Sequence, residues 1–72
     1  MAWRTLSPFT SSNLESVRYD DEQNVLEVTF LNGGIYQYFD VPPHVADAFE
    51  RADSKGTFLA SDIKGNYRYS KV

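Results

Sequence analysis

The stretch from Val25 to Pro43 constrains the fold more than any other part of this sequence. Residues 26–30 alternate apolar and polar side chains, which is the period-two pattern of a half-buried strand. Asn32-Gly33-Gly34 then supplies residues that tolerate positive φ, as the turn of a β-hairpin requires. In the next strand Tyr36 and Tyr38 share one face, and Ile35, Gln37 and Phe39 share the other. The proline pair that follows ends the strand, because proline cannot donate to a sheet and favours a first helical turn. The stretch therefore predicts a β-hairpin followed by a helix.

The length of the hairpin turn decides which side chains share a face of the sheet. A two-residue turn places Phe30 opposite Ile35, whereas a three-residue turn places Phe30 opposite Tyr36. We favour the three-residue turn, with Gly34 at positive φ, because it groups the large apolar side chains of the first strand with the tyrosines of the second. On that choice Tyr36 and Tyr38 are core residues. With the shorter turn they form an exposed platform.

The flanking segments predict one more strand and two short helices. Leu14–Tyr19 alternates in the same way and is expected to form the first strand of the sheet. After the prolines, His44–Ala52 has apolar residues at helical spacing. The residues of this helix that are expected to face the core are Val45, Ala48, Phe49 and Ala52. A second helix is expected over Thr57–Ile63, with Ser54 as its N-cap and Gly65 at its C-terminal end.

The ends of the chain complete the predicted fold. Residues 66–72 alternate tyrosines with polar residues, which suits either a fourth strand or an extended tail along the sheet. We predict an α+β domain: a three-stranded antiparallel meander, with or without this fourth C-terminal strand, and two short helices packed on one face. Residues 1–10 form an N-terminal arm that either docks on the core through Trp3 or stays flexible. Residues 11–72 form a single domain.

The composition narrows the class of protein. A chain of 72 residues allows one domain with a small core. Because it has no cysteine, disulfides, thiol catalysis and cysteine-ligated metal sites are excluded. No apolar run is long enough to cross a bilayer, and the first residues lack the apolar core of a signal peptide. We therefore expect a cytoplasmic protein with no membrane role.

The sequence offers little chemistry for catalysis. His44 is the only imidazole, and it stands at a predicted helix start, where the dipole disfavours its charged form. No nucleophile motif and no glycine-rich phosphate loop is present. The acidic loop of residues 20–24 lacks the oxygen spacing and the central glycine of a calcium loop. We expect no catalytic residue, no metal and no cofactor.

Charge is distributed unevenly along the chain, whose net charge is −3. Residues 1–53 carry three arginines and nine carboxylates, a net −6, whereas residues 54–72 carry four cations and one carboxylate, a net +3. In this second part cations alternate with tyrosines, which suits RNA because bases stack on aromatic rings and phosphates pair with Lys or Arg. The predicted RNA-binding residues are Lys55, Lys64, Tyr67, Arg68, Tyr69 and Lys71, extended by Tyr36 and Tyr38 if those are exposed.

The competing class is a protein-interaction module, either an adaptor or a homodimer. A small domain can gain apolar burial by association, and an exposed edge strand, for which Leu14–Tyr19 is the candidate, can accept a strand from a partner. RNA binding weakens with salt, whereas association of this kind depends on concentration. The two classes are therefore separable by experiment.

The order of landmarks in this sequence resembles the KTSC domain family. That family is named after its occurrence at the C-terminus of some lysyl-tRNA synthetases, and it also occurs as small stand-alone bacterial proteins. A Tyr-x-Tyr motif near its centre is its hallmark, and Tyr36-Gln37-Tyr38 stands at that place. The other landmarks are Ser11-Ser12-Asn13, Tyr19-Asp20, Val28-Thr29-Phe30, Gly34, Val41-Pro42, Ala52-Asp53-Ser54-Lys55-Gly56, Phe58, Ile63 and Tyr67. The resemblance implies a small bacterial domain without an established activity, for which RNA binding is the suggested role.

Overall fold

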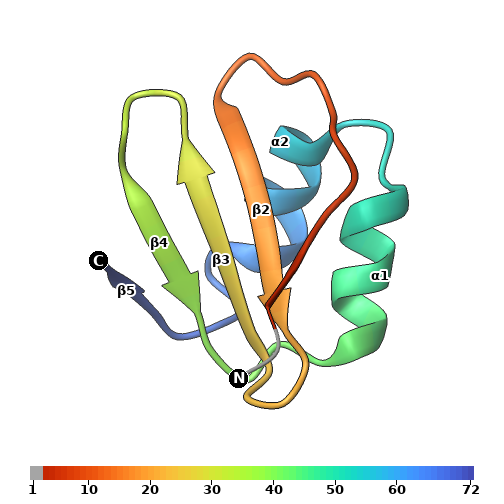
Figure 1. Cartoon of the computed structure of the whole chain (residues 1–72), viewed down its shortest axis with the longest axis vertical. Coiled ribbons are helices and arrows are strands. Elements are labelled where there is room, and N and C mark those ends of the chain that lie inside the picture. The colour runs from red at the N-terminus through yellow and green to blue at the C-terminus, as the bar shows by residue number, and fades with distance from the viewer. Residues whose placement is uncertain (1–2) are drawn as a thin grey trace.

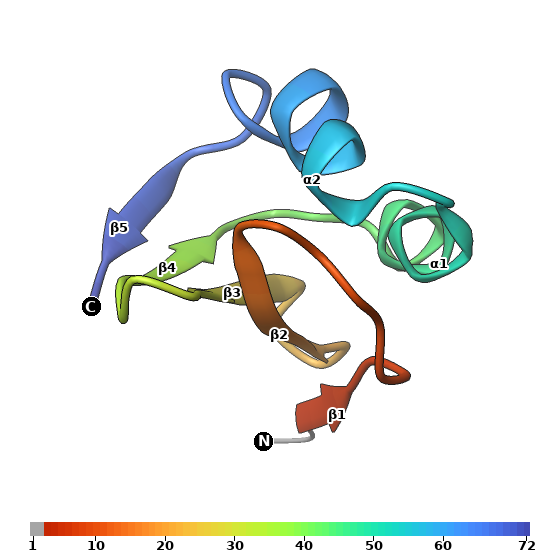
Figure 2. The same cartoon turned by 90° about the horizontal axis from the view of Figure 1, so that it is seen from above.

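A five-stranded antiparallel sheet, in the order β1-β2-β3-β4-β5, forms the centre of the computed structural model, which describes residues 3–72 (Figure 1). The strands are β1 Trp3–Thr5, β2 Leu14–Asp20, β3 Val25–Phe30, β4 Ile35–Tyr38 and β5 Tyr69–Lys71. Between β4 and β5 the chain forms α1 Pro43–Arg51, α2 Lys55–Phe58 and the π-helical turn η1 Leu59–Ile63. Figure 2 shows α1 and α2 on the same side of the sheet. The α+β class is confirmed, and the predicted three or four strands are corrected to five.

The outer strands of the sheet come from the two ends of the chain. β1 lies within the predicted N-terminal arm and pairs with β2, with Arg4 opposite Tyr19. β5 pairs with β4, with Tyr69 opposite Tyr38. The prediction that Leu14–Tyr19 is an exposed edge strand is therefore wrong, because β2 lies between β1 and β3. β1 and β5 hold the two edges instead.

The β3–β4 turn has the predicted length but begins earlier in the chain. Val28 lies opposite Tyr36, and the Phe30 N–H donates to the Gly34 carbonyl at 2.8 Å, which encloses a three-residue loop. The positive φ of 93° belongs to Gly33 and not to Gly34 as predicted. Tyr36 was predicted to lie opposite Phe30 and lies opposite Val28, so the pairing is displaced by two residues. A displacement of two residues leaves a side chain on the same face of the sheet, and Tyr36 therefore keeps its predicted face. The tyrosines therefore lie on the side of the sheet that the helices cover.

The hydrophobic core fills the space between the sheet and the helices. Its buried members are Leu6, Leu14, Val17, Tyr19, Leu26, Val28, Tyr38, Val41, Ala46, Phe49, Leu59 and Ile63. α1 faces this core with Ala46 and Phe49, whereas Ala48, which was predicted to be buried, is exposed. A face that includes Ala48 and a face that includes Ala46 both satisfy helical spacing. The direction in which the chain enters α1 determines which of the two faces the core. Buried Val41 fixes that entry, since its N–H donates to the Asn24 carbonyl at 2.9 Å.

The second helical segment begins two residues before the predicted Thr57, at Lys55. Ser54 caps it as predicted, because its hydroxyl accepts the Thr57 N–H at 3.3 Å. The segment ends in a π-helical turn, in which the Lys64 N–H donates to the Leu59 carbonyl at 2.8 Å. Gly65 follows with φ 84° and stops the helix, as predicted. Within residues 3–72 no helix is both long and apolar enough to cross a membrane.

Candidate binding cleft

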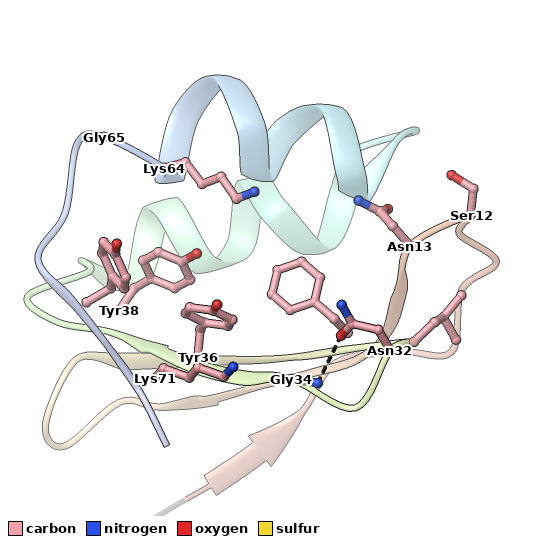
Figure 3. A pocket seen from close by; sticks show the side chains of 12 residues that line it. Ser12, Asn13, Asn32, Gly34, Tyr36, Tyr38, Lys64, Gly65 and Lys71 are labelled. Atoms are coloured by element: carbon pink, nitrogen blue, oxygen red, sulfur yellow. Dashed lines mark hydrogen bonds between the residues drawn. The ribbon is translucent and has the colours of Figure 1, made fainter.

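A cleft of about 890 Å³ opens between the end of η1, strands β4 and β5, and the β3–β4 turn (Figure 3). Among residues 3–72, two lysines line it and no carboxylate does. Its lining residues are Ser12, Asn13, Phe30, Leu31, Asn32, Gly34, Tyr36, Tyr38, Lys64, Gly65, Tyr69 and Lys71. An acidic chain thus carries a local site that is free of negative side chains.

Aromatic rings on the helix-facing side of β4 and β5 form the floor of the cleft. The ring centroid of Tyr69 lies 5.9 Å from that of Tyr36 and 5.8 Å from that of Tyr38. Phe30 packs edge-on against Tyr36, with centroids 5.5 Å apart. Burial, followed by the neighbouring hydroxyls of Tyr36 and Tyr69, raises the pKa of Tyr38. The cluster runs from buried Tyr38, which is 3% exposed, to Tyr69, which is 59% exposed, so part of its aromatic surface is open to a ligand.

Two lysines enter the cleft from opposite sides, as Figure 3 shows. The Nζ of Lys64, at the end of η1, lies 5.7 Å from the ring centroid of Phe30. The Nζ of Lys71, on β5, lies 6.0 Å from the ring centroid of Tyr36. Neither lysine forms an ion pair within residues 3–72. Both charges are therefore available to an anion that reaches the aromatic floor.

Arg68 and Tyr67, also predicted to bind RNA, lie outside this cleft. The Arg68 guanidinium is 3.7 Å from the Asp40 carboxylate and 5.3 Å from the ring centroid of Phe39. Residues 69 and 71 face the cleft, so residue 68 points to the other side of β5. Tyr67 is half-buried and lines a separate pocket together with His44 of α1.

Lys55 is engaged elsewhere in the fold. Its Nζ donates to the carbonyls of Glu50 and Ala52, at 2.9 and 2.6 Å, and so satisfies the C-terminal end of α1. It also lies 5.6 Å from the ring centroid of Phe9. Of the six predicted binding residues, the structure thus brings together Lys64, Tyr69 and Lys71, and it adds Tyr36 and Tyr38 to them.

Asn13 and Asn32 line the cleft but were not predicted as site residues. The Leu31 N–H donates to the Asn13 carbonyl at 2.9 Å, which joins the loop before β2 to the β3–β4 turn. The Asn32 side chain accepts the Gly34 N–H at 3.0 Å. The contact between Leu31 and Asn13 joins segments far apart in the sequence, so no local periodicity predicts it. The Ser11-Ser12-Asn13 landmark was the one available signal.

The face of the sheet that the helices leave open carries a row of paired polar residues. The Arg18 Nε donates to Glu27 at 2.7 Å, and the Gln37 Nε2 donates to the same carboxylate at 2.9 Å. The guanidinium of Arg18 also lies 4.1 Å from the ring centroid of Trp3 on β1. The hydrogen bond from Arg18 holds the pKa of Glu27 below its usual value. Because this cation is already engaged, the face is a weaker anion site than the cleft.

The acidic loop after β2 has a structural explanation. The Asp20 side chain is buried, and its Oδ1 accepts the backbone N–H groups of Glu22 and Gln23 at 2.9 and 3.2 Å. This hydrogen bonding closes the β2–β3 hairpin. Within residues 3–72, no group of three or more His, Asp or Glu side chains is arranged to hold a metal ion.

Known proteins resemble this chain over nearly its whole length. The sequence model of the KTSC domain family matches residues 10–67. An uncharacterized protein of Stutzerimonas stutzeri is 44% identical over 63 residues, which are 86% of this chain and 89% of that protein. A lysine–tRNA ligase of Nostoc sp. is 33% identical over 72 residues, which are 100% of this chain and 13% of the ligase. The crystal structure of a KTSC domain protein from Yersinia pestis matches with a TM-score of 0.90 and 37% identity, over 99% of both chains.

Proposed function

The chain belongs to the KTSC domain family, which is not a known catalytic family, and on that premise we propose that it is a non-catalytic domain that binds RNA through the cleft. One observation carries the proposal: within the described residues 3–72, two lysines without an ion pair flank a tyrosine cluster in a cleft that no carboxylate lines. RNA offers bases that stack on aromatic rings and phosphates that pair with ammonium groups. The similarity to a segment of a ligase named for tRNA supports the same proposal.

The size and charge of the cleft favour a short unpaired stretch of RNA over a long duplex. Two lysines neutralise about two phosphates, so affinity for a single strand should fall roughly sevenfold between about 50 and 200 mM salt. Stacking of one base on an aromatic side chain contributes about 1–3 kcal/mol and does not depend on salt. Stacking on Tyr36 and Tyr69 is therefore the main source of affinity in this proposal, and Lys64 and Lys71 hold the backbone.

The test is an amide chemical-shift titration of the ¹⁵N-labelled protein with a single-stranded pentanucleotide, and separately with an RNA hairpin, at low and moderate salt. We expect shifts at Gly34, Gly65 and Tyr69–Lys71 that weaken with salt. Lys64→Gln and Lys71→Gln should each reduce affinity severalfold. Arg51→Gln, which removes an exposed cation at the end of α1, is the matched control and should change affinity little. Absence of shifts with both RNAs, or an equal loss in the control, would overturn the proposal.

Arg68 provides a comparison within the same segment. Its charge is already paired with Asp40 and points away from the cleft, so Arg68→Gln should reduce affinity less than Lys71→Gln does. An equal or larger loss would mean that RNA runs along the outer side of β5, and the cleft would then not be the binding site.

A second candidate function is association with a protein partner or a second copy through the edge at β5. It is favoured by the exposed apolar side chains near that edge, since Leu31, Tyr69 and Val72 are 54%, 59% and 62% exposed. The outer side of β5 also presents unpaired backbone groups that can add a strand. Sedimentation at several protein concentrations separates the two functions. Self-association that increases with concentration and does not change with salt would favour this second candidate.

A further inference from the structure

Two asparagines at one end of the cleft are held so that they present hydrogen-bond donors. The Asn32 Oδ1 accepts the Gly34 N–H at 3.0 Å, and because a backbone N–H can only donate, the amide nitrogen of Asn32 must point the other way. The Asn13 Oδ1 accepts the Ser11 hydroxyl at 3.0 Å. That hydroxyl already accepts the N–H groups of Asn13 and Leu14, at 3.3 and 3.2 Å, so its single hydrogen is left for the Asn13 oxygen.

Gly56 of α2 adds to the restraint on Asn13. A Cβ atom at Gly56 would stand 2.9 Å from the Asn13 Oδ1, so this oxygen is packed against the helix. Figure 3 shows the amide nitrogens of Asn13 and Asn32 on the cleft side. Neither nitrogen has a hydrogen-bond partner in the described part of the chain. Lys64 and Lys71 can only donate, so the lining side chains of fixed polarity all present donors to the cleft, whereas the hydroxyl groups of its serine and tyrosines can rotate to donate or accept.

Given the RNA-binding role proposed above, on which this step rests, we infer that the cleft prefers uracil or guanine over cytosine or adenine. When phosphates lie at the lysines and a base stacks on Tyr36, the part of the base that reaches Asn13 and Asn32 is the exocyclic group farthest from the sugar. That group is a carbonyl acceptor in uracil and guanine and an amino donor in cytosine and adenine. An amino group there would leave both amide nitrogens without an acceptor. A site built from fixed hydrogen-bonding groups binds such a ligand less tightly, because its own polar groups stay unpaired.

Oligouridine and oligocytidine pentamers provide the direct comparison, because they share backbone, charge and ring size. We expect the uridine pentamer to bind about fivefold to tenfold more tightly than the cytidine pentamer. The side-chain NH₂ resonances of Asn13 and Asn32 should shift with uridine. Equal affinities, with the same shifts in the cleft, would overturn the base preference and leave RNA binding standing. Binding of neither pentamer and of no RNA hairpin would overturn both.

Asn32→Asp tests the donor directly, because aspartate still accepts the Gly34 N–H but offers an acceptor where asparagine offers a donor. The added charge weakens binding of both pentamers alike, so the ratio of their affinities is the quantity to measure. We expect the ratio to fall to one or to invert. Gln23→Glu adds the same charge at an exposed position of the β2–β3 hairpin and should leave the ratio unchanged. An unchanged ratio in Asn32→Asp and in the parallel variant Asn13→Asp would overturn the inference.

Discussion

The Glu27 carboxylate accepts two hydrogen bonds from the Arg18 guanidinium, at 2.7 and 3.2 Å, on the face of the sheet that no helix covers. The bond from Arg18 is the largest cause of the lowered pKa of Glu27, and burial opposes it. Gln37 donates to the same carboxylate at 2.9 Å, so this one side chain joins β2, β3 and β4. The pair therefore stabilises the central strands from the solvent side, as the core does from the other.

Glu27→Gln should lower the free energy of unfolding by about 1 kcal/mol near neutral pH, since Arg18 loses a charged partner but stays partly hydrated. Because the pKa of Glu27 is lowered in the folded state, its carboxylate stabilises the protein at pH values above its ordinary pKa of 4.5. This contribution is lost as the pH falls through the folded-state pKa. The variant should therefore lose less stability than the wild type between about pH 5 and pH 3. Urea denaturation at several pH values measures both effects. Glu15→Gln, an exposed position on β2, is the control, and an equal acid sensitivity of Glu27→Gln and wild type would contradict the assignment.

Tyr19→Phe should destabilise the fold by about 1–2 kcal/mol, because it leaves a buried carbonyl without its donor. The Tyr19 hydroxyl donates to the Val41 carbonyl at 2.5 Å and lies 3.1 Å from the Asn24 side chain, so it joins the entry of α1 to the β2–β3 hairpin. Chemical denaturation measures the loss. Tyr67→Phe is the matched control, since the Tyr67 hydroxyl has no hydrogen bond within residues 3–72. Equal stabilities of the two variants would contradict this role for Tyr19.

Gly56→Ala should destabilise the wild-type protein and stabilise the Asn13→Ala protein. Alanine favours a helix over glycine by up to about 1 kcal/mol, but its Cβ would meet the Asn13 Oδ1 at 2.9 Å. Removal of the asparagine side chain removes the clash and leaves the helical gain. Unfolding free energies of the four proteins in this double-mutant cycle measure the coupling. A Gly56→Ala effect of the same sign in both backgrounds would show that the close approach has no energetic consequence.

Glu50→Ala should loosen the N-terminal strand without unfolding the domain. The Glu50 carboxylate accepts hydrogen bonds from the Arg4 guanidinium at 2.9 Å and from the Ser7 N–H at 3.2 Å, and the bond to Arg4 is the main cause of its lowered pKa. The Arg4–Glu50 pair is partly exposed and contributes about 1 kcal/mol to the stability of this segment. Amide exchange at Leu6 should therefore accelerate about fivefold when the pair is removed. The Leu6 N–H, which donates to the Val17 carbonyl, is the probe, and Val28 on β3 is the reference that should not change.

Tyr38→Phe should make the protein more resistant to alkali. Burial raises the pKa of Tyr38 above the ordinary 10.0, so its contribution to stability is complete below that pH and is lost as the pH rises through the folded-state pKa. Guanidinium denaturation at about pH 9 and pH 11 measures the loss in each protein. The variant should lose less stability over this range than the wild type does. An identical alkaline loss would mean that Tyr19, whose pKa burial also raises, accounts for the effect alone.

The alternation of side chains was sufficient to predict β2, β3 and β4, because each of these strands has one face in the core. The alternation in residues 66–72 allowed a strand or a tail, and β5 is the strand, because the free edge of β4 pairs with it. β1 was not predicted, because three residues are too few for a period to be recognised and its place depends on the free edge of β2. The β3–β4 turn shows a related limit. Two adjacent glycines offer positive φ equally well, so the choice of Gly33 depends on how the finished strands pair.

The sequence also contained part of the site. The mixture of cations and tyrosines after η1 pointed to Lys64, Tyr69 and Lys71, and a strict period of two would have separated Arg68 from them. Lys55 could not be excluded from sequence, because its role depends on the carbonyls of α1 that fold against it. Asn13 reaches the cleft through its backbone contact with Leu31, and such a contact exists only after the sheet has formed.

The placement of β1 and β5 at opposite edges of the sheet has a practical consequence for binding assays. A tag or surface linkage added after Val72 would begin one residue beyond Lys71, which lines the cleft, and the Val72 N–H itself donates to the Ile35 carbonyl at 2.9 Å. The opposite edge, at β1, is separated from the cleft by the width of the sheet. Immobilisation through the amino-terminal side therefore leaves the tyrosines and lysines accessible, whereas attachment at the carboxyl end would obstruct the surface being measured.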